Sequence, residues 1–137
     1  ERTAEEVKMQ IGSAYPEGEG KTMGIRGRDL VTGLPRTIEF TSADSFQAMA
    51  EPINNVIDGI KSVLERTPPE LASDIVDKGI VLSGGGSLLN GFTKLLSEET
   101  GIPIHLAEDP LSCVVLGTGR LLENIEKSNL IVGRRSV

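Results

Sequence analysis

The chain has 137 residues, which is enough for one domain or two small ones with a real hydrophobic core. Lys and Arg number 14 against 20 Asp and Glu, and the net charge of -6 disfavours sequence-independent nucleic-acid binding and a polybasic membrane contact. No apolar run approaches the roughly 20 residues of a membrane-spanning helix, and the single cysteine, Cys113, excludes an internal disulfide. The chain begins without Met and inside a helical pattern, so we expect a fragment of a longer cytoplasmic protein.

The first part of the chain predicts a helix followed by a hairpin. Ala4, Val7 and Ile11 share one helical face, and a Gly-Ser pair then ends the helix. Two short extended runs, residues 22–26 and 36–41, flank a loop and predict a β-hairpin.

Residues 42–66 are predicted to form two helices. Ser42 can cap a short helix that reaches Met49, and Pro52 stands near the start of the next helix. The second helix carries an apolar stripe at helical spacing, which predicts core packing: Ile53, Val56, Ile57, Ile60, Val63 and Leu64. Residues 67–70 then break the chain and start a further short helix.

The second half of the chain has an α/β pattern. Residues 79–82 and 102–106 are predicted as short strands, the first of them buried. Between them lies a predicted amphipathic helix with the apolar residues Leu88, Leu89, Phe92, Leu95 and Leu96. A last helix over residues 114–126 is expected to break near residues 117–119, and the tail shows no clear element.

The sharpest chemical signal is the Gly-rich turn at Gly84, Gly85 and Gly86, between a strand and a helix. Glycine lets a backbone approach a ligand closely, and the N–H groups that begin a helix suit an anion. Neither a Walker A loop nor a Rossmann fingerprint is present. A purely structural turn is the alternative, and the spacing alone leaves both open.

A second signal is the pair Glu5 and Lys8, which lie three residues apart on the first helix. As a surface ion pair they would contribute at most about 0.5 kcal/mol to stability. As ligand-binding groups they would hydrogen-bond a sugar hydroxyl or a base edge.

Other polar residues carry weaker signals. Four charged residues flank the hairpin loop and fit a solvated loop better than an anion site: Arg26, Arg28, Asp29 and Arg36. His105 and Cys113 are expected to be structural, with Cys113 a small buried side chain. The spacing supports no catalytic triad, no pair of catalytic carboxylates and no metal site.

Residues 79–91 resemble the adenosine motif of the superfamily that contains actin, sugar kinases and heat-shock ATPases. Longer runs are similar to MreB and its paralogues such as Mbl, the bacterial actins that set rod shape: residues 1–8, 11–14, 26–35, 62–71, 98–101, 107–110 and 116–119. The resemblance extends to about Lys127, and the tail does not help to choose a paralogue.

The resemblance implies an α/β chain that is part of an actin-like ATPase fold, which is ribonuclease H-like, with a small α+β subdomain inserted. Residues 1–11 would be a helix of the large subdomain of the second lobe, and residues 12–66 would be the small subdomain. Residues 67–108 would complete the large subdomain with the adenosine motif. Residues 109–137 would be a C-terminal helix and tail, and the helix belongs to the first lobe in the family.

The resemblance also implies an ATP site, with Mg²⁺ in the full-length protein. Carried over residue by residue, the adenosine-side contacts fall on Glu5, Glu6, Val7, Lys8, Gly84, Gly85, Gly86, Ser87 and Leu88. The family's phosphate loops, metal-coordinating acids and water-positioning carboxylate all lie before Glu1. No catalytic residue or metal ligand is therefore expected here, and the chain alone is predicted to hydrolyse no ATP.

The implied partners are further copies of the protein in head-to-tail filaments, paired on the inner membrane face through the first lobe. The cell-wall elongation proteins RodZ and MreC are also implied, and nucleic acid is not. Filament contacts are expected in the small subdomain and around residues 67–70. The last helix, cut off from the first lobe, would expose Leu116, Leu121, Leu122 and Ile125.

Two alternatives to this function remain. One is another ATPase of the superfamily, such as a sugar kinase or chaperone ATPase, and the other is a free-standing binding module with a structural Gly-rich turn.

Overall fold

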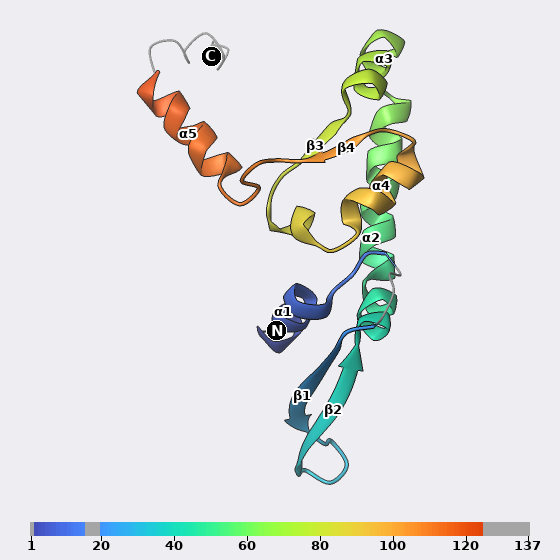
Figure 1. Cartoon of the computed structure of the whole chain (residues 1–137), viewed down its shortest axis with the longest axis vertical. Helices are drawn as coiled ribbons and strands as arrows, with labels where there is room; N and C mark the ends of the chain where they lie inside the picture. The colour runs from blue at the N-terminus through green and yellow to red at the C-terminus, as the bar shows by residue number, and fades with distance from the viewer. Residues whose placement is uncertain (1, 16–19, 125–137) are drawn as a thin grey trace, which may run out of the picture.

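The structure, a computed structural model, describes residues 2–15 and 20–124, and helices and small sheets alternate along them (Figure 1). The elements in chain order are α1 (Arg2–Ile11), β1 (Thr22–Arg28), β2 (Pro35–Thr41), α2 (Ser42–Glu65), α3 (Pro69–Lys78), β3 (Ile80–Leu82), the 3₁₀ turn η1 (Gly85–Leu88), α4 (Phe92–Thr100), β4 (Ile104–Leu106) and α5 (Cys113–Glu123). This mixture confirms the predicted α/β class. None of the helices in the described ranges is long and apolar enough to cross a membrane.

The described strands form two separate two-stranded sheets. β1 and β2 pair antiparallel, with Thr22 opposite Thr41 and Arg28 opposite Pro35, which confirms the predicted hairpin. β3 and β4 pair in parallel, with Ile80 opposite Ile104. The hairpin lies at one end of the molecule, and the parallel pair lies beside the far half of α2 (Figure 1). β3 was expected to be buried, but Val81 is 66% exposed because the described chain places nothing over it.

The prediction of two helices over residues 42–66 is wrong, because α2 runs unbroken through Pro52. A proline inside a helix removes one backbone hydrogen bond and costs about 3 kcal/mol. Burial of one Ile side chain contributes about 1.5–3 kcal/mol, and both Ile53 and Ile57 are buried on the face that follows the proline. The free energy gained by burying the two Ile side chains therefore outweighs the cost of the proline in the helix. The predicted stripe is only partly confirmed, since Val56 and Val63 are about half exposed.

Thr41, rather than the predicted Ser42, caps α2. The Asp44 N–H donates to Thr41 Oγ1 at 3.1 Å, and the Thr41 N–H donates to Asp44 Oδ2 at 2.9 Å. This reciprocal pair satisfies two of the N–H groups at the start of the helix. The Thr41 side chain, followed by the Thr41 backbone, lowers the pKa of the Asp44 carboxyl.

The core lies between α2 and α4 and joins the two halves of the chain. Its buried members are Ala14, Ile53, Ile57 and Leu96, of which Ala14 and Leu96 are wholly inaccessible. Partly buried apolar residues surround them: Met49, Ile60, Leu82, Leu89, Phe92, Leu95 and Ile104. The core thus draws on both of the predicted ranges 12–66 and 67–108, whose boundaries stay a prediction.

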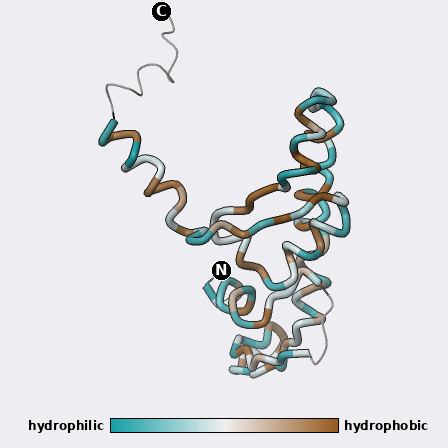
Figure 2. Tube along the Cα trace, turned by 45° about the horizontal axis from the view of Figure 1, so that its top comes forward, coloured by the Kyte–Doolittle hydropathy of each residue, from teal (hydrophilic) through white to brown (hydrophobic). Residues whose placement is uncertain are grey.

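α5 continues through residues 117–119, where a break was predicted. The Thr118 hydroxyl lies within hydrogen-bond distance of the Val114 and Val115 carbonyl oxygens, at 3.0 and 2.9 Å, and it adds a side-chain link to this turn. Figure 1 shows α5 standing away from the other helices, and Figure 2 shows hydrophobic residues recurring along it. Leu122 is 70% exposed, which agrees with the predicted apolar face. The predicted helix end at Glu126, together with Ile125 and the tail, lies outside the described residues.

Thr41→Ala removes the hydroxyl that accepts the Asp44 N–H, and we expect it to lower the free energy of unfolding by about 1 kcal/mol. Urea denaturation followed by circular dichroism measures this change. Thr41→Ser keeps the hydroxyl and is the matched control.

The stability lost in Thr41→Ala should depend on pH, because the cap includes the Asp44 carboxylate. Because the folded-state pKa of Asp44 lies below its ordinary value of 3.8, its contribution is present above that pH and is lost as the pH falls through the lowered pKa. The difference between Thr41→Ala and Thr41→Ser should therefore shrink in acid. Equal stability of the two variants at pH 7 would contradict the assigned cap.

Candidate functional site

The first group of predicted site residues lies on α1. Val7 is buried and anchors the helix, whereas Glu5, Glu6 and Lys8 are exposed. Glu6 pairs with Arg2 at 3.5 Å. Within the described ranges no ion pair joins Glu5 to Lys8, so the interpretation of these two residues as a surface pair finds no support.

The second group lies on the Gly-rich turn between β3 and η1. Gly84 has φ 81°, a conformation that other residues rarely adopt, and its N–H donates to the Pro110 carbonyl at 2.7 Å. A Cβ placed on Gly86 would meet no atom within 4 Å, and one on Gly85 would meet only Leu111, at 3.4 Å. The turn is therefore tied down at Gly84 and open at Gly86.

Ser87 closes the turn from inside. Its side chain is buried, and its hydroxyl donates to the Gly84 carbonyl at 2.6 Å while its N–H donates to the same oxygen at 3.2 Å. This hydroxyl therefore holds the turn, whereas Leu88 beside it is 51% exposed. In the described part of the chain, the N–H groups of Gly85 and Gly86 have no hydrogen-bond partner.

The helix that was predicted to follow the turn directly begins later. η1 is a single 3₁₀ turn, and α4 starts at Phe92. The reason is local: Leu89 is extended, and Gly91 takes the left-handed conformation with φ 71°. The N-terminus of α4 therefore does not follow the Gly-rich turn directly, as the sequence suggested.

A backbone bridge links the segment after α1 to the segment after η1. Ser13 and Asn90 form an isolated parallel bridge, and the Ala14 N–H donates to the Asn90 carbonyl at 2.8 Å. Each residue lies two positions beyond its element, Ser13 after α1 and Asn90 after η1. The two segments run in the same direction where they meet. The sequence analysis missed this link, since backbone hydrogen bonds leave no signature in residue type.

The bridge is reinforced by close packing around Tyr15. A Cβ on Gly91 would lie 2.5 Å from the Tyr15 Cβ, so only glycine fits there. The Lys94 ammonium lies 4.0 Å from the centre of the Tyr15 ring, and the Tyr15 hydroxyl donates to Glu98 at 3.3 Å. These contacts fix the exit of α1 against the start of α4.

His105 and Cys113, the other candidates from the sequence, contact neighbouring parts of the chain. His105 is an exposed residue of β4, and its ring lies where a Cβ on Gly79 would come within 2.9 Å. Cys113 is half-buried rather than buried, and its thiol donates to the Asp109 carbonyl at 3.2 Å. No group of three or more His, Cys, Asp and Glu side chains in the described ranges could hold a metal ion.

The protein-family model described as MreB/Mbl protein matches residues 1–130. The chain belongs to the MreB/Mbl family. It is 46% identical over 127 residues to the cell shape-determining protein Mbl of Bacillus subtilis (strain 168), covering 93% of this chain and 38% of that protein. It is 48% identical over 126 residues to the cell shape-determining protein MreB of Escherichia coli (strain K12), covering 92% of this chain and 36% of that protein.

Solved structures give the same assignment. The crystal structure of MreB5 of Spiroplasma citri bound to ADP superposes with a TM-score of 0.86 at 36% identity, over 96% of this chain and 40% of that chain. The AMPPNP-bound structure of the same protein also gives 0.86. These matches confirm the actin-like fold and decide against a sugar kinase or chaperone ATPase. The chain spans well under half the length of the relatives that it matches.

Gly91→Ala should break the link between the two groups, because the new methyl would overlap the Tyr15 side chain. Gly101→Ala is the matched control, since Gly101 also has a positive φ but no atom lies within 4 Å of its Cβ position. We expect Gly101→Ala to cost about 1 kcal/mol of stability and Gly91→Ala clearly more. Urea denaturation measures both, and equal costs would contradict the packing at Tyr15.

Proposed function

We propose that this chain supplies the adenosine side of an ATP site in a longer protein that forms filaments and determines cell shape. The observation that carries the proposal is the parallel bridge between Ser13 and Asn90. It ties the segment after α1, which carries the exposed polar residues, to the segment after the Gly-rich turn. Both groups were identified separately in the sequence, and a nucleoside is a ligand that would use them together.

The chemistry of the two groups fits a nucleoside. Gly86 has open space where a side chain would lie, so a flat ring or a ribose can approach the backbone. The N–H groups of Gly85 and Gly86, which have no partner among the described residues, are donors for ligand oxygen or nitrogen atoms. Glu5 and Lys8 add an acceptor and a donor for the ribose hydroxyls and the base. The ADP- and AMPPNP-bound MreB5 structures, which this chain resembles, support ATP as the nucleotide.

The proposed division of labour leaves phosphate chemistry to the rest of the protein. Phosphoryl transfer needs a metal ion, phosphate clamps and an oriented water. The described residues offer no carboxylate cluster for Mg²⁺, so the ion would bind the full-length protein elsewhere. This chain would bind and orient the adenosine half of ATP, with Ser87 and Val7 as supports rather than as ligand contacts.

The cellular part of the proposal follows the family, whose curated relatives are cell shape-determining proteins. We infer head-to-tail filaments in the cytoplasm, held at the inner membrane face through the first lobe. RodZ and MreC are proposed as partners in cell-wall elongation. The exposed apolar side chains of α5 are consistent with a helix that packs on another lobe, as the resemblance implies.

Gly86→Ala should weaken nucleotide binding without unfolding the chain, because the new methyl meets nothing in the protein but fills the space proposed for the nucleoside. We expect a loss of about tenfold in affinity, equivalent to about 1.4 kcal/mol. Titration of the full-length protein with a fluorescent ATP analogue, displaced by adenosine, measures the change.

Gly59→Ala on α2 is the matched control for that titration, since a Cβ there also meets no atom within 4 Å. Its affinity should equal that of the unaltered protein. If Gly86→Ala binds as tightly as Gly59→Ala, the nucleoside does not lie against the Gly-rich turn and the proposal fails.

We expect the 137-residue chain alone to hydrolyse no ATP, because the resemblance places the groups that clamp and cleave the phosphates before Glu1. Release of inorganic phosphate with Mg²⁺ present measures this, and a Glu5→Ala, Gly85→Ala double variant is the control. Turnover above that control would mean that catalytic groups lie within this chain.

A further inference from the structure

Leu111 lies against the Gly-rich turn, although the sequence gave no reason to place it in the site. A Cβ placed on Gly85 would lie 3.4 Å from the Leu111 Cδ2 atom, and it would meet no other described atom within 4 Å. The Gly84 N–H donates to the carbonyl of Pro110, the residue before Leu111, at 2.7 Å. The Leu111 side chain is therefore held one residue away from Gly86, where the space for a side chain is open.

The loop that carries this leucine, residues 107–112 between β4 and α5, is tied at both ends. The Ala107 N–H donates to the Leu82 carbonyl of β3 at 2.9 Å. The Ser112 N–H donates to the Asp109 carbonyl at 3.2 Å and closes a turn just before α5. The loop therefore has a defined shape at the Gly-rich turn without any ligand.

The Leu111 side chain presents an apolar surface to solvent beside unused backbone donors. Leu111 is 68% exposed. The N–H groups of Gly85 and Gly86 have no hydrogen-bond partner among the described residues. An apolar wall with a few polar groups beside it is typical of a site for a small ligand. A purine uses both kinds of contact, because its faces are apolar and its edges and the attached ribose carry hydrogen-bonding atoms.

We propose that Leu111 is the surface on which the adenine ring of the nucleotide lies. This inference rests on the proposed function and adds a residue to the same site. The ribose fits an aliphatic side chain poorly, because its hydroxyls would lose hydrogen bonds to water there, and the charged phosphates fit it worse. The face of the base is the part of the nucleotide that gains free energy by leaving water for a leucine side chain.

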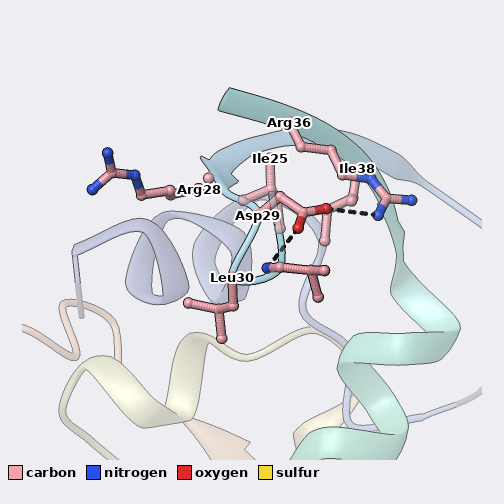
Figure 3. Close-up of a pocket in the computed structure, with 8 residues that line it drawn as sticks. Ile25, Arg28, Asp29, Leu30, Arg36 and Ile38 are labelled. Atoms are coloured by element: carbon pink, nitrogen blue, oxygen red, sulfur yellow. Dashed lines mark hydrogen bonds and ion pairs between the residues drawn. The ribbon is translucent and has the colours of Figure 1, made fainter. Parts of the chain in front are cut away.

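Leu30, in the hairpin loop, is a matched control because it is also an exposed leucine on a loop of fixed shape. It is 97% exposed. The Asp29 carboxylate accepts the N–H groups of Val31 and Thr32 at 2.9 and 3.0 Å, and Arg36 contacts it at 3.3 Å (Figure 3). The Thr32 N–H and then the Val31 N–H lower the pKa of Asp29, so the carboxylate stays charged at neutral pH. Figure 1 shows the hairpin loop well away from the yellow segment that carries the Gly-rich turn.

Leu111→Ala in the full-length protein tests the contact, with ethenoadenosine triphosphate as the probe because its fluorescence comes from the base. Titration measures its affinity, and quenching of the bound probe by acrylamide measures how far the base is exposed. We expect Leu111→Ala to weaken binding about tenfold, through the apolar contact that is lost. The quenching constant of the bound base should rise, because one face of the ring loses its cover.

Two further variants complete the experiment. Leu111→Met keeps an apolar side chain of similar volume and should bind the probe within about threefold of the unaltered protein. Leu30→Ala should change neither the affinity nor the quenching constant. Circular dichroism melts confirm that each variant is folded.

The outcomes separate this inference from the function on which it rests. If Leu111→Ala binds as tightly as Leu30→Ala, the base does not lie on Leu111. Weaker binding with an unchanged quenching constant also overturns the contact, since Leu111 would then only support the turn or another part of the protein. In both cases the proposed function stands if Gly86→Ala still weakens binding. If the unaltered protein binds neither the probe nor ATP, the nucleotide function and this inference both fail.

Discussion

The arrangement of this chain depends on the close approach of residues 13–15 to Asn90 and Gly91. Ala14 is wholly buried in the core at this point, and its N–H is satisfied by the Asn90 carbonyl. Gly91 leaves room for Tyr15, as no residue with a side chain could. A side chain at position 91 would push these two backbones apart, and with them the segments that follow α1 and the Gly-rich turn. The candidate site is therefore positioned by a backbone contact that contains no functional side chain.

Local sequence patterns predicted the elements whose causes are local. The hairpin follows from two extended runs around a turn, and α3 begins at the Pro-Pro pair as expected. Errors arose where packing outweighs a local rule. Pro52 should end a helix by its own geometry, but the burial of Ile53 and Ile57 carries α2 through it. The sequence also did not predict η1. Its apolar residues continue the helical spacing of α4, but the left-handed Gly91 interrupts the helix between them.

The candidate site was predictable in its parts and not in its assembly. Glycines after a strand and a polar pair on a helix are visible in the sequence, and the family resemblance assigns them to one ligand. The role of Ser87 could not be predicted, because the residue type does not show whether a serine hydroxyl bonds its own turn or a ligand. Ser13 and Asn90 were missed because their link uses main-chain groups, which every residue carries.

α2 reaches from the hairpin to α3, and its 24 residues make a rod of about 36 Å. Its middle packs in the core beside the bridge, so the rod is held near its centre. A small rotation of α2 about its packed middle therefore displaces its two ends. A tilt of about 10° at the core would move each end by about 3 Å in opposite directions. Pro52 removes one backbone hydrogen bond close to the packed middle of α2. The helix is therefore easiest to bend at the same place about which it would rotate.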